Sequence, residues 1–510
     1  MPTIRFSPGD LDLFAEASHD CNPLHVSPLY ARKTAFGEPI VFGVLGALAA
    51  LGTVPPDAAR LVSSLSLSFR HPLFCNIDYR VTVSQGESRT MKIAVEDAGR
   101  VMLTGRVVFR PGQAPLASAG GQPASSVPFE VPREPRMFSA AELKPGLTVT
   151  GKYGPAPRAL QQLFERWRLE NQGMSLGQIG ALLWCSYLVG MHLPGRQALF
   201  SELRLEFCPE ILGNALPLSY RAEVQDLDER FNLLRVTGDV HFDQRLCARA
   251  ELSAFVRSEV PHVSRGALEE RLTRSTVLSG STALVIGGSR GLGSALVAAL
   301  ASQGCHVLLN YHSCAAEAAT LQECLCDESG RVSLVQGDAS DVTWTQQLRA
   351  DLRDQGRTLN LLFCNAAPAL RNLGLAPDAV ERMCTFVCSS FAMVCTPIAA
   401  FHDSLESSAG RTILISSSVL SDNAAPLPKN WVHYIAAKSA AEGYVRAVAS
   451  QSLRSNYLIV RPPRMQTEMT NTPTGHHGAV PVEEVAAAIV RRVCQPPGGR
   501  PLEILDLGDR

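Results

Sequence analysis

The sequence lacks several features that would place it in a special class of proteins. Aromatic residues make up only 6% of the chain and the formal net charge is -1, which favours neither nucleic acid nor an anionic membrane as partner. The first residues have no basic start followed by an apolar stretch, so no signal peptide is expected. The longest apolar run, Ile40–Val54, is shorter than the roughly 20 residues of a membrane span.

Cysteine is present, with 14 residues, but in no pattern that suggests disulfides or a metal site. The cysteines are scattered through apolar segments, and no Cys/His group has metal-ligand spacing. We expect Cys305, Cys364, Cys388 and Cys395 to be buried in strands and helices. The chain is therefore predicted to be a cytoplasmic protein with reduced thiols and no metal.

The 510 residues, 46% hydrophobic and 19% charged, are enough for two to four globular domains. Residues 113–137 are rich in Pro, Gly, Ala and Ser, and residues 259–279 are polar, so both are predicted to be linkers. They separate three folded parts, 1–112, 138–258 and 280–510.

The first two parts resemble each other. Each has an apolar helix rich in Gly and Ala, at Ile40–Leu51 and Leu176–His192, followed by an alternating strand, at Leu61–Phe69 and Leu199–Phe207. A further pair of strands is expected in each part: Tyr79–Val83 with Val101–Phe109, and Leu218–Val224 with Leu234–Phe242. The pattern predicts an α+β fold, a helix wrapped by a curved sheet, given twice, with the two sheets paired as a pseudo-dimer.

The third part has short apolar runs without alternation, separated by helical patterns. The runs are Ala283–Ile286, Val307–Leu309, Leu361–Cys364, Thr412–Ile415 and Leu458–Val460. Such strands indicate an α/β doubly wound parallel sheet buried on both faces.

A glycine-rich loop joins the first of these strands to a helix. Glycines allow the tight turn and the close approach of backbone to a pyrophosphate, which then rests on the positive end of the helix. The residues expected to bind a dinucleotide here are Gly287, Ser289, Arg290, Gly291, Leu292 and Gly293.

Further motifs recur after the later strands, and together they resemble the short-chain dehydrogenase/reductase family, with a Rossmann-type fold, over 281–510. They are Asp338, Asn365-Ala366-Ala367, Ser416-Ser417-Ser418, Tyr434-Ile-Ala-Ala-Lys438 and the segment from Pro462 to Thr467. The resemblance implies that Tyr434 protonates a carbonyl oxygen as hydride arrives and that Ser417, or Ser418 if the register slips by one, binds the same oxygen. It also implies that Lys438 holds the nicotinamide ribose, and that Asp338, Asn365, Ala366, Pro462 and Thr467 line the cofactor site. A nearby ammonium is expected to lower the pKa of the Tyr434 phenol.

Charge predicts the choice of cofactor. An acidic residue at the end of the second strand would repel a 2′-phosphate, but this strand ends in Asn310-Tyr311-His312, and Arg290 stands in the glycine-rich loop. We therefore expect NADPH, with Asn310 in the binding set.

Two positions depart from the family. The family usually has an Asn that relays protons to the Lys; no Asn occurs between Asn372 and Asn423, and the matching position falls near Cys388. Pro463 also replaces the usual Gly. Either change is expected to slow or restrict the reductase.

Near the N-terminus, Asp20-Cys-Asn22-Pro23-Leu-His25 cannot be one regular helix because Pro23 interrupts it, so Asp20 and His25 could converge from a loop. An isolated Asp/His pair is more often a surface or capping arrangement. However, the wider pattern over 10–110 resembles the MaoC-like (R)-specific enoyl-CoA hydratases, which have a hotdog fold. The resemblance implies that Asp20 and His25, with Asn22 beside them, act on one water, and that the N–H of Gly43 polarises a thioester carbonyl.

This part departs from its family too. Phe42 stands where a His is common before that Gly, and Leu51 where a Ser is frequent. The second part looks like another hotdog repeat without the signature, so its expected role is to shape an acyl groove.

Together the parts predict a bifunctional NADPH-dependent 3-ketoacyl-thioester reductase and 3-hydroxyacyl-thioester dehydratase of fatty-acid- or polyketide-like biosynthesis. Its substrate would be carried on CoA or acyl carrier protein, and we expect a homo-oligomer, most simply a dimer. One alternative is the reverse chemistry, hydration followed by NAD-dependent oxidation in a degradative pathway. Others are a reductase with a non-catalytic hotdog module that docks a carrier protein, and a reductase that acts on a non-thioester ketone or a sugar.

Overall fold

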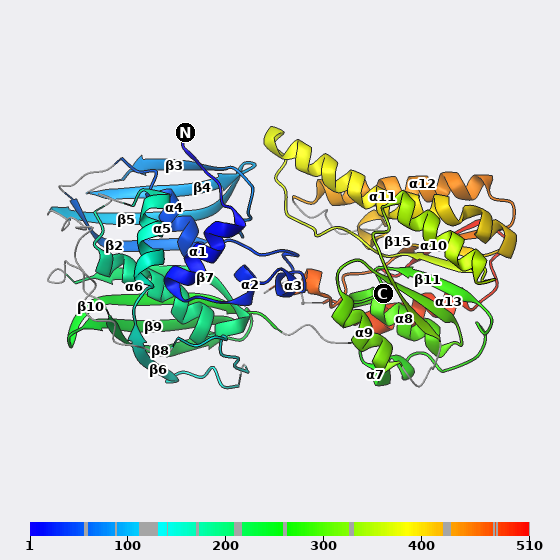
Figure 1. Cartoon of the computed structure of the whole chain (residues 1–510), viewed down its shortest axis with the longest axis horizontal. Coiled ribbons are helices and arrows are strands. Elements are labelled where there is room, and N and C mark those ends of the chain that lie inside the picture. The colour runs from blue at the N-terminus through cyan, green and yellow to red at the C-terminus, as the bar shows by residue number, and fades with distance from the viewer. Residues whose placement is uncertain are drawn as a thin grey trace. The chain divides into compact units, whose positions relative to one another are not determined.

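A computed structural model gives the fold (Figure 1). It describes residues 1–55, 60–86, 89–111, 131–139, 141–169, 173–208, 217–258, 263–325, 331–421, 430–472, 475 and 478–508. Most of the predicted linker 113–137, as well as Asn423, lies outside the described residues. The chain forms two compact units, Met1–Ser258 and Glu259–Arg510.

The first unit is built on one ten-stranded antiparallel sheet, in the order β1-β3-β4-β5-β2-β7-β10-β9-β8-β6. The strands are β1 (Thr3–Ile4), β2 (Arg60–Phe69), β3 (Tyr79–Gln85), β4 (Thr90–Asp97), β5 (Arg100–Pro111), β6 (Thr148–Tyr153), β7 (Ala198–Phe207), β8 (Leu218–Asp228), β9 (Leu233–Phe242) and β10 (Arg245–Val256). The order reads the same from both edges: β1, β3, β4, β5 and β2 in one half correspond to β6, β8, β9, β10 and β7 in the other. The halves join where β2 pairs with β7, with Leu65 opposite Leu205 and Leu67 opposite Leu203.

Two buried helices, α4 (Gly43–Leu51) and α6 (Leu176–Tyr187), lie against this sheet, one from each half (Figure 1). The remaining helices of the unit are α1 (Pro8–Ser18), α2 (Pro23–Val26), α3 (Pro28–Ala31), α5 (Pro157–Trp167), the π-helical turn η1 (Leu188–His192) and the 3-10 turn η2 (Gly195–Gln197). Apolar side chains of the two helices and the inner face of the sheet form one continuous core. Residues 1–112 thus show the expected hotdog arrangement, a central helix covered by a curved sheet.

The sequence patterns located most of these elements but not all. The expected strands 61–69, 199–207, 79–83, 101–109, 218–224 and 234–242 correspond to β2, β7, β3, β5, β8 and β9. The strands β1, β4, β6 and β10 were not predicted; β4 pairs with both of its sequence neighbours, β3 and β5, and β10 pairs with β9. The predicted helix Leu176–His192 is α-helical only to Tyr187, and its last five residues form the wider turn η1.

The second unit is a seven-stranded, wholly parallel sheet in the order β13-β12-β11-β14-β15-β16-β17. Its strands are β11 (Thr282–Ile286), β12 (His306–Tyr311), β13 (Val332–Gln336), β14 (Leu361–Cys364), β15 (Arg411–Ile415), β16 (Asn456–Arg461) and β17 (Leu502–Asp506). The helices are α7 (Arg265–Glu269), α8 (Gly291–Ser302), α9 (Ala315–Cys324), α10 (Val342–Asp354), α11 (Val380–Ser408), α12 (Val432–Gln451) and α13 (Val482–Val493). One core forms on the side of α8 and α13 and another on the side of α11 and α12. This is the doubly wound, Rossmann-type sheet that the unalternated strands predicted.

Part of the predicted linker 259–279 is instead folded. Residues 265–269 form α7, and Leu268, Leu272 and Leu278 are buried in the core of the second unit. The Ser264 N–H donates to the Glu483 carboxylate of α13 (2.8 Å). Apolar side chains at these spaced positions, within an otherwise polar stretch, explain why composition alone suggested a linker.

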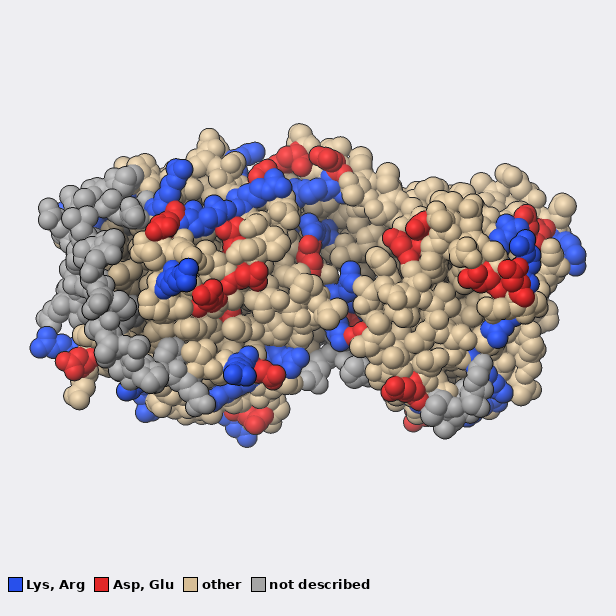
Figure 2. All heavy atoms as spheres, in the orientation of Figure 1, with Lys and Arg blue, Asp and Glu red and all other residues tan. Residues whose placement is uncertain are grey.

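One helix, Pro377–Ser408, is long and apolar enough by length and composition to cross a membrane. The length of the longest uninterrupted apolar run alone did not predict it. In the structure this segment includes α11, which packs against α10, α12 and β14. Basic and acidic side chains are interspersed over the face of each unit shown in Figure 2, without a large field of one sign.

Candidate active sites

Asp20 and Asn22 lie in the buried loop that follows α1. His19 closes α1 in the left-handed conformation (φ 56°), and Asn22 caps α2 by accepting from the Leu24 N–H, so that Pro23 opens the new helix. Asp20 is 2% exposed and Asn22 1%. The proline predicted to break the helix therefore begins a second one, and in the loop between them Asp20 and Asn22 are buried while His19 and Cys21 are half-buried.

Asp20 is held by a residue far away in the chain. The Ser186 hydroxyl of α6 donates to Asp20 Oδ2 (2.7 Å), and the Asn22 N–H donates to Asp20 Oδ1 (3.2 Å). Burial raises the pKa of Asp20 to about 7, although both hydrogen bonds lower it. The carboxyl group therefore exchanges its proton near neutral pH. Sequence reasoning missed Ser186, because the half that contains it has no acid/base signature.

His25 sits on α2 with one ring nitrogen engaged. Its Nδ1 lies 2.7 Å from the Ile40 carbonyl oxygen, and its ring stacks on Phe42 with the centroids 3.9 Å apart. Burial lowers the pKa of His25 to about 4; the Ile40 carbonyl opposes this effect and the positive charge of Arg257 adds to it. A neutral ring that donates from Nδ1 has its lone pair on Nε2, where it can accept a proton.

The same stacking gives Phe42 a place in the site. It is buried before Gly43, where the family more often has His, and its ring also packs against Phe14 at 4.7 Å. Gly43 begins α4, so its N–H belongs to the first turn, which has no intrahelical acceptor. A Cβ there would lie 2.8 Å from the Phe69 ring, so glycine is required. Leu51, at the far end of α4, is core.

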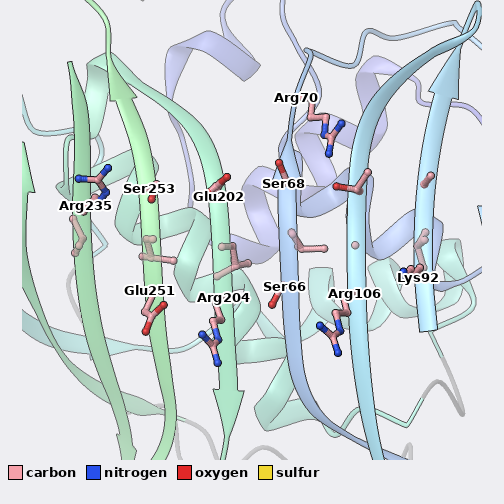
Figure 3. A pocket seen from close by; sticks show the side chains of 18 of the residues that line it. Ser66, Ser68, Arg70, Lys92, Arg106, Glu202, Arg204, Arg235, Glu251 and Ser253 are labelled. Atoms are coloured by element: carbon pink, nitrogen blue, oxygen red, sulfur yellow. The ribbon is translucent and has the colours of Figure 1, made fainter. Parts of the chain in front are cut away.

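A groove in the first unit lies away from these residues. A groove of about 920 Å³ lies on the outer face of the sheet, with the helices on the opposite face (Figure 3). Its lining includes Arg70, Lys92, Arg106, Glu202 and Glu251, and none of the candidate catalytic residues. The groove is therefore separate from the Asp20 site.

In the second unit the glycine-rich turn joins β11 to α8 as expected. Gly287 and Gly291 have positive φ angles of 73° and 53°, which glycine adopts without strain. A Cβ on Gly293 would lie 2.0 Å from the Gly287 carbonyl oxygen, so the helix can approach the turn only with glycine there. Asn365, after β14, donates to the same carbonyl (3.0 Å). The turn leaves the first N–H groups of α8 facing the carboxyl edge of the sheet, where Ser289, Arg290 and Leu292 also lie.

Of the other predicted cofactor residues, Ala366 and Thr467 lie beside this turn, whereas the contacts of Asp338 and Pro462 are with other residues. Ala366 lies within 3.1 Å of the position of a Cβ on Gly287, and Thr467 within 3.5 Å of one on Gly291. The Asp338 carboxylate accepts from Ser340, which lowers its pKa. The Pro462 carbonyl accepts from the Ser418 N–H (3.0 Å).

Asn310 has a more internal position than predicted. Its side chain is buried and bonds the Gly287 N–H and the Val335 and Gly337 carbonyls. All three partners are backbone groups. Asn310 thus connects β12 to the glycine turn and to the end of β13 by hydrogen bonds, and it stabilises the turn of the predicted cofactor site rather than facing a ligand.

Ser417, Tyr434 and Lys438 converge at the end of β15. The Ser417 hydroxyl is hydrogen-bonded to Tyr434, whereas Ser418 turns toward Gly508. Lys438 Nζ donates to the Ile415 carbonyl (2.8 Å) and lies 5.8 Å from the centre of the Tyr434 ring. The expected order of residues is present, with Ser417 rather than Ser418 against the phenol.

The ionisation of this group differs from the prediction. Burial raises the pKa of Tyr434 above its usual value, and only the Ser417 hydrogen bond opposes it. Burial also lowers the pKa of Lys438 to about 8, against the charges of Glu442 and Cys364. The predicted lowering of the phenol pKa was therefore wrong for this structure, because burial disfavours the charged phenolate more than the Ser417 hydrogen bond favours it.

The surroundings of Cys388, near which the missing Asn is predicted to fall, differ from the prediction in burial. Cys388 is exposed rather than buried, whereas Cys305 and Cys364 are buried as expected and Cys395 is half-buried. Two residues further along α11, the Ser390 hydroxyl is buried without a hydrogen-bond partner. Ser390, Tyr434 and Lys438 line one cavity of about 20 Å³, room for about one water. Cys388 was misplaced because a shift of two residues rotates a side chain to another face of a helix.

Comparisons with known proteins agree with both halves of this description. The family model described as "MaoC like domain" matches residues 1–104, and that described as "short chain dehydrogenase" matches 281–476. An (R)-specific enoyl-CoA hydratase of Aeromonas caviae is 33% identical over 113 residues, which cover 22% of this chain and 84% of the hydratase. The uncharacterized oxidoreductase YgfF of Escherichia coli (strain K12) is 28% identical over 229 residues, 41% of this chain and 90% of that protein.

Among solved structures, a dehydrogenase/reductase from Sinorhizobium meliloti 1021 is 24% identical and covers 48% of this chain and 99% of its own, with a TM-score of 0.40. The hydratase relative is matched over most of its length, and both family models fall where the structure places the corresponding folds. The chain therefore belongs to the MaoC-like family through its N-terminal domain, and it also carries a C-terminal domain that matches the short-chain dehydrogenase model.

Proposed function

We propose that this protein is a bifunctional enzyme that reduces a 3-ketoacyl thioester with NADPH and dehydrates the resulting 3-hydroxyacyl thioester to a 2-enoyl thioester. One observation carries the proposal: a Tyr/Lys/Ser group and an Asp/His pair, with Asp20 buried and His25 half-buried, occur on one chain, and the reactions proposed for them are consecutive. Reduction of the 3-ketone makes the hydroxyl group that dehydration removes. The substrate would be carried on CoA or on an acyl carrier protein.

The protonation state of Tyr434 supports the reductive direction. Since burial raises its pKa, the phenol keeps its proton at neutral pH and can deliver it to a carbonyl oxygen. Ser417 would hold the same oxygen. When bound, the nicotinamide cofactor supplies the hydride. Lys438 would orient the cofactor's ribose, and a water in the cavity between Ser390 and Lys438 would return the proton in place of the missing Asn.

The glycine turn fits a dinucleotide, because Gly287, Gly291 and Gly293 leave its backbone open beside the N-terminus of α8. Arg290 at the N-cap of α8, and the Tyr311-His312 pair in place of an acid, favour a 2′-phosphate. The preference for NADPH predicts a lower KM for NADPH than for NADH. Arg290→Ala should narrow that difference by raising the KM for NADPH only.

In the dehydratase site, His25 Nε2 would take the C2 proton while Asp20, in its protonated form, gives its proton to the departing 3-hydroxyl. The opposite shifts of the two pKa values favour this division of roles, since at about pH 5 to 6 the histidine is neutral and the carboxyl group holds its proton. The Gly43 N–H would polarise the thioester carbonyl. We further infer that residues 138–258 are a second hotdog repeat, supported by the matching strand order of the two halves.

The test is to incubate the full chain with NADPH and a panel of 3-ketoacyl-CoA and carrier-bound substrates, with mass spectrometry of the products. The expected products are 3-hydroxyacyl and 2-enoyl thioesters. Asp20→Asn should stop the sequence at the 3-hydroxyacyl stage. Formation of neither product at any chain length would contradict the proposal, as would unaltered enoyl formation by the variant. Hydration coupled to NAD-dependent oxidation would support the degradative alternative instead.

A further inference from the structure

Three successive residues of the Asp20 loop are held by the second half of the first unit. The Ser186 hydroxyl donates to Asp20 Oδ2 at 2.7 Å. The Cys21 N–H points to the Met191 sulfur at 3.2 Å, and Asn22 Nδ2 donates to the Gly190 and Gly195 carbonyls, each at 3.0 Å. The partners come from the end of α6, from η1 and from η2. The half without an acid/base signature thus forms one wall of the loop that carries the acid.

The π-helical turn η1 gives this wall its shape. A Cβ on Gly190 would lie 2.1 Å from Asp20 Oδ1, so the carboxyl group fits only against glycine. A π turn is wider than an α turn and occurs often at functional sites. Here it directs the Gly190 carbonyl toward Asn22 while its bare Cα faces Asp20. Ser186 on one oxygen and Gly190 against the other together fix the plane of the carboxyl group.

From this geometry we propose that the second repeat is a working part of the dehydratase site, with Ser186 as the positioning residue for Asp20 and Gly190 as the residue that makes room for it. The inference rests on the proposed dehydratase function and deepens it. Ser186 touches no substrate atom in this scheme and acts through Asp20. The repeat would have lost, or never had, its own acid/base pair, yet the pair of the first repeat depends on it.

The hydrogen bond has a measurable consequence for ionisation. A hydroxyl that donates to a carboxylate stabilises its charged form, so loss of Ser186 should make Asp20 keep its proton to higher pH. The pKa values of the other titratable groups around Asp20 are shifted away from the pH range in which Asp20 loses its proton. Burial raises the pKa of Cys21, Tyr153, Cys185 and Tyr187, and lowers that of His19, His25 and His192. The alkaline limb of the pH profile should therefore report Asp20.

The experiment compares Ser186→Ala with Cys185→Ala in the full-length protein. Cys185 is the preceding buried residue of α6, and its thiol bonds Ala181 rather than Asp20. Hydration of crotonyl-CoA is measured as kcat/KM against pH. We expect the alkaline limb of Ser186→Ala to move up by about one pH unit, that of Cys185→Ala to stay at the wild-type pH, and Ser186→Thr to restore the wild-type limb. Gly190→Ala should abolish hydration while the circular dichroism spectrum stays folded.

The outcomes distinguish failure of the proposed dehydratase function from failure of the proposed role of Ser186. If the wild type hydrates no 2-enoyl thioester, or Asp20→Asn hydrates as well as the wild type, the proposed function fails. If the wild type is active but Ser186→Ala keeps the wild-type limb, the role of Ser186 is wrong and the function stands. Should Ser186→Ala unfold, Ser186→Cys keeps a weak donor and decides the point: an alkaline limb at higher pH than that of the wild type supports the role, and an unshifted limb overturns it.

Discussion

The proposed dehydratase site of the first unit and the proposed reductase site of the second reach their geometry by different routes. In the second unit every strand is parallel, so Ser417, Asn365 and the glycine turn meet because each follows a strand at the same edge of the sheet. In the first unit the sheet is antiparallel, and its strand order is the same from both edges. There Asp20 meets Ser186 across 166 residues of sequence, through the packing of two similar halves.

The two sites also handle protons differently. In the proposed dehydratase pair Asp20 is buried and His25 is half-buried. Burial raises the pKa of Asp20 to about 7 and lowers that of His25 to about 4. The reductase site keeps a phenol whose pKa is raised and an ammonium whose pKa is lowered to about 8. In the parallel sheet, strand order determines which side chains lie together, and local contacts determine their pKa values. In the first unit, one half of the sheet supplies contacts that change the pKa of a residue in the other half.

The largest effect should come from separating the sites by mutation. Tyr434→Phe removes the proton donor of the reductase, and we expect ketoacyl reduction to fall by roughly 10²–10⁴-fold, the usual contribution of a general acid. Dehydration of added 3-hydroxyacyl thioester should be unchanged. Tyr444→Phe is the matched control, because Tyr444 lies on the same helix with its hydroxyl 3.5 Å from the Cys395 carbonyl. Both rates are followed in one spectrophotometric assay; equal loss in the two variants would reject Tyr434 as the donor.

Dehydration and reduction should also differ in their dependence on pH. Beyond its limiting pKa, each rate should fall by about tenfold per pH unit. Dehydration needs neutral His25 and protonated Asp20, so it should be greatest between the two pKa values of about 4 and about 7. Reduction should persist until the Lys438 ammonium loses its proton, at a pKa of about 8, since Tyr434 keeps its proton to higher pH. In the coupled reaction, 3-hydroxyacyl thioester should accumulate as the pH is raised. Alkaline limbs in the reverse order would contradict this assignment.

The same contrast explains what could be predicted from the sequence. Apolar runs and motif order placed the reductase fold, with Tyr434 and Lys438, because chain order along a parallel sheet maps onto position at one edge. The Asp20–His25 signature was local and therefore visible. Ser186 and Gly190 were not, because nothing in a buried Gly- and Ala-rich helix shows which of its side chains meets a loop of another repeat. Ser390 was missed for a smaller reason: two residues along a helix decide which face a side chain occupies.

A smaller effect tests the cavity beside Lys438. Ser390→Ala removes the unpartnered hydroxyl that would hold a water, and reduction should slow by about 3- to 10-fold, the value of one hydrogen bond. A solvent isotope effect on kcat should rise, since proton return becomes more limiting. Cys388→Ala, on the exposed face of the same helix, should change neither quantity. A wild-type rate and isotope effect in Ser390→Ala would show that the proton returns by another path.

The smallest effect is on stability, and it concerns the buried carboxyl group of Asp20 alone. The pKa of Asp20 is raised from 3.8 to about 7, so its ionised form opposes folding. This penalty is absent below the unfolded pKa, grows as the pH rises toward the folded pKa, and is complete above it. Asp20→Asn keeps an acceptor for Ser186 but carries no charge. We therefore expect it to raise the Tm of the first unit by roughly 3–8 °C at about pH 8 and to have little effect at about pH 4.

Calorimetry at both pH values checks the change in Tm. The Ser186→Ala variant provides the complementary case, because loss of its hydrogen bond should destabilise the protein more at the higher pH, where Asp20 is charged. Together the two variants tie the stability of the fold to the proton that the site uses. A gain for Asp20→Asn that is the same at both pH values would show that the side chain matters through packing, and that the buried carboxyl group is not held at a raised pKa.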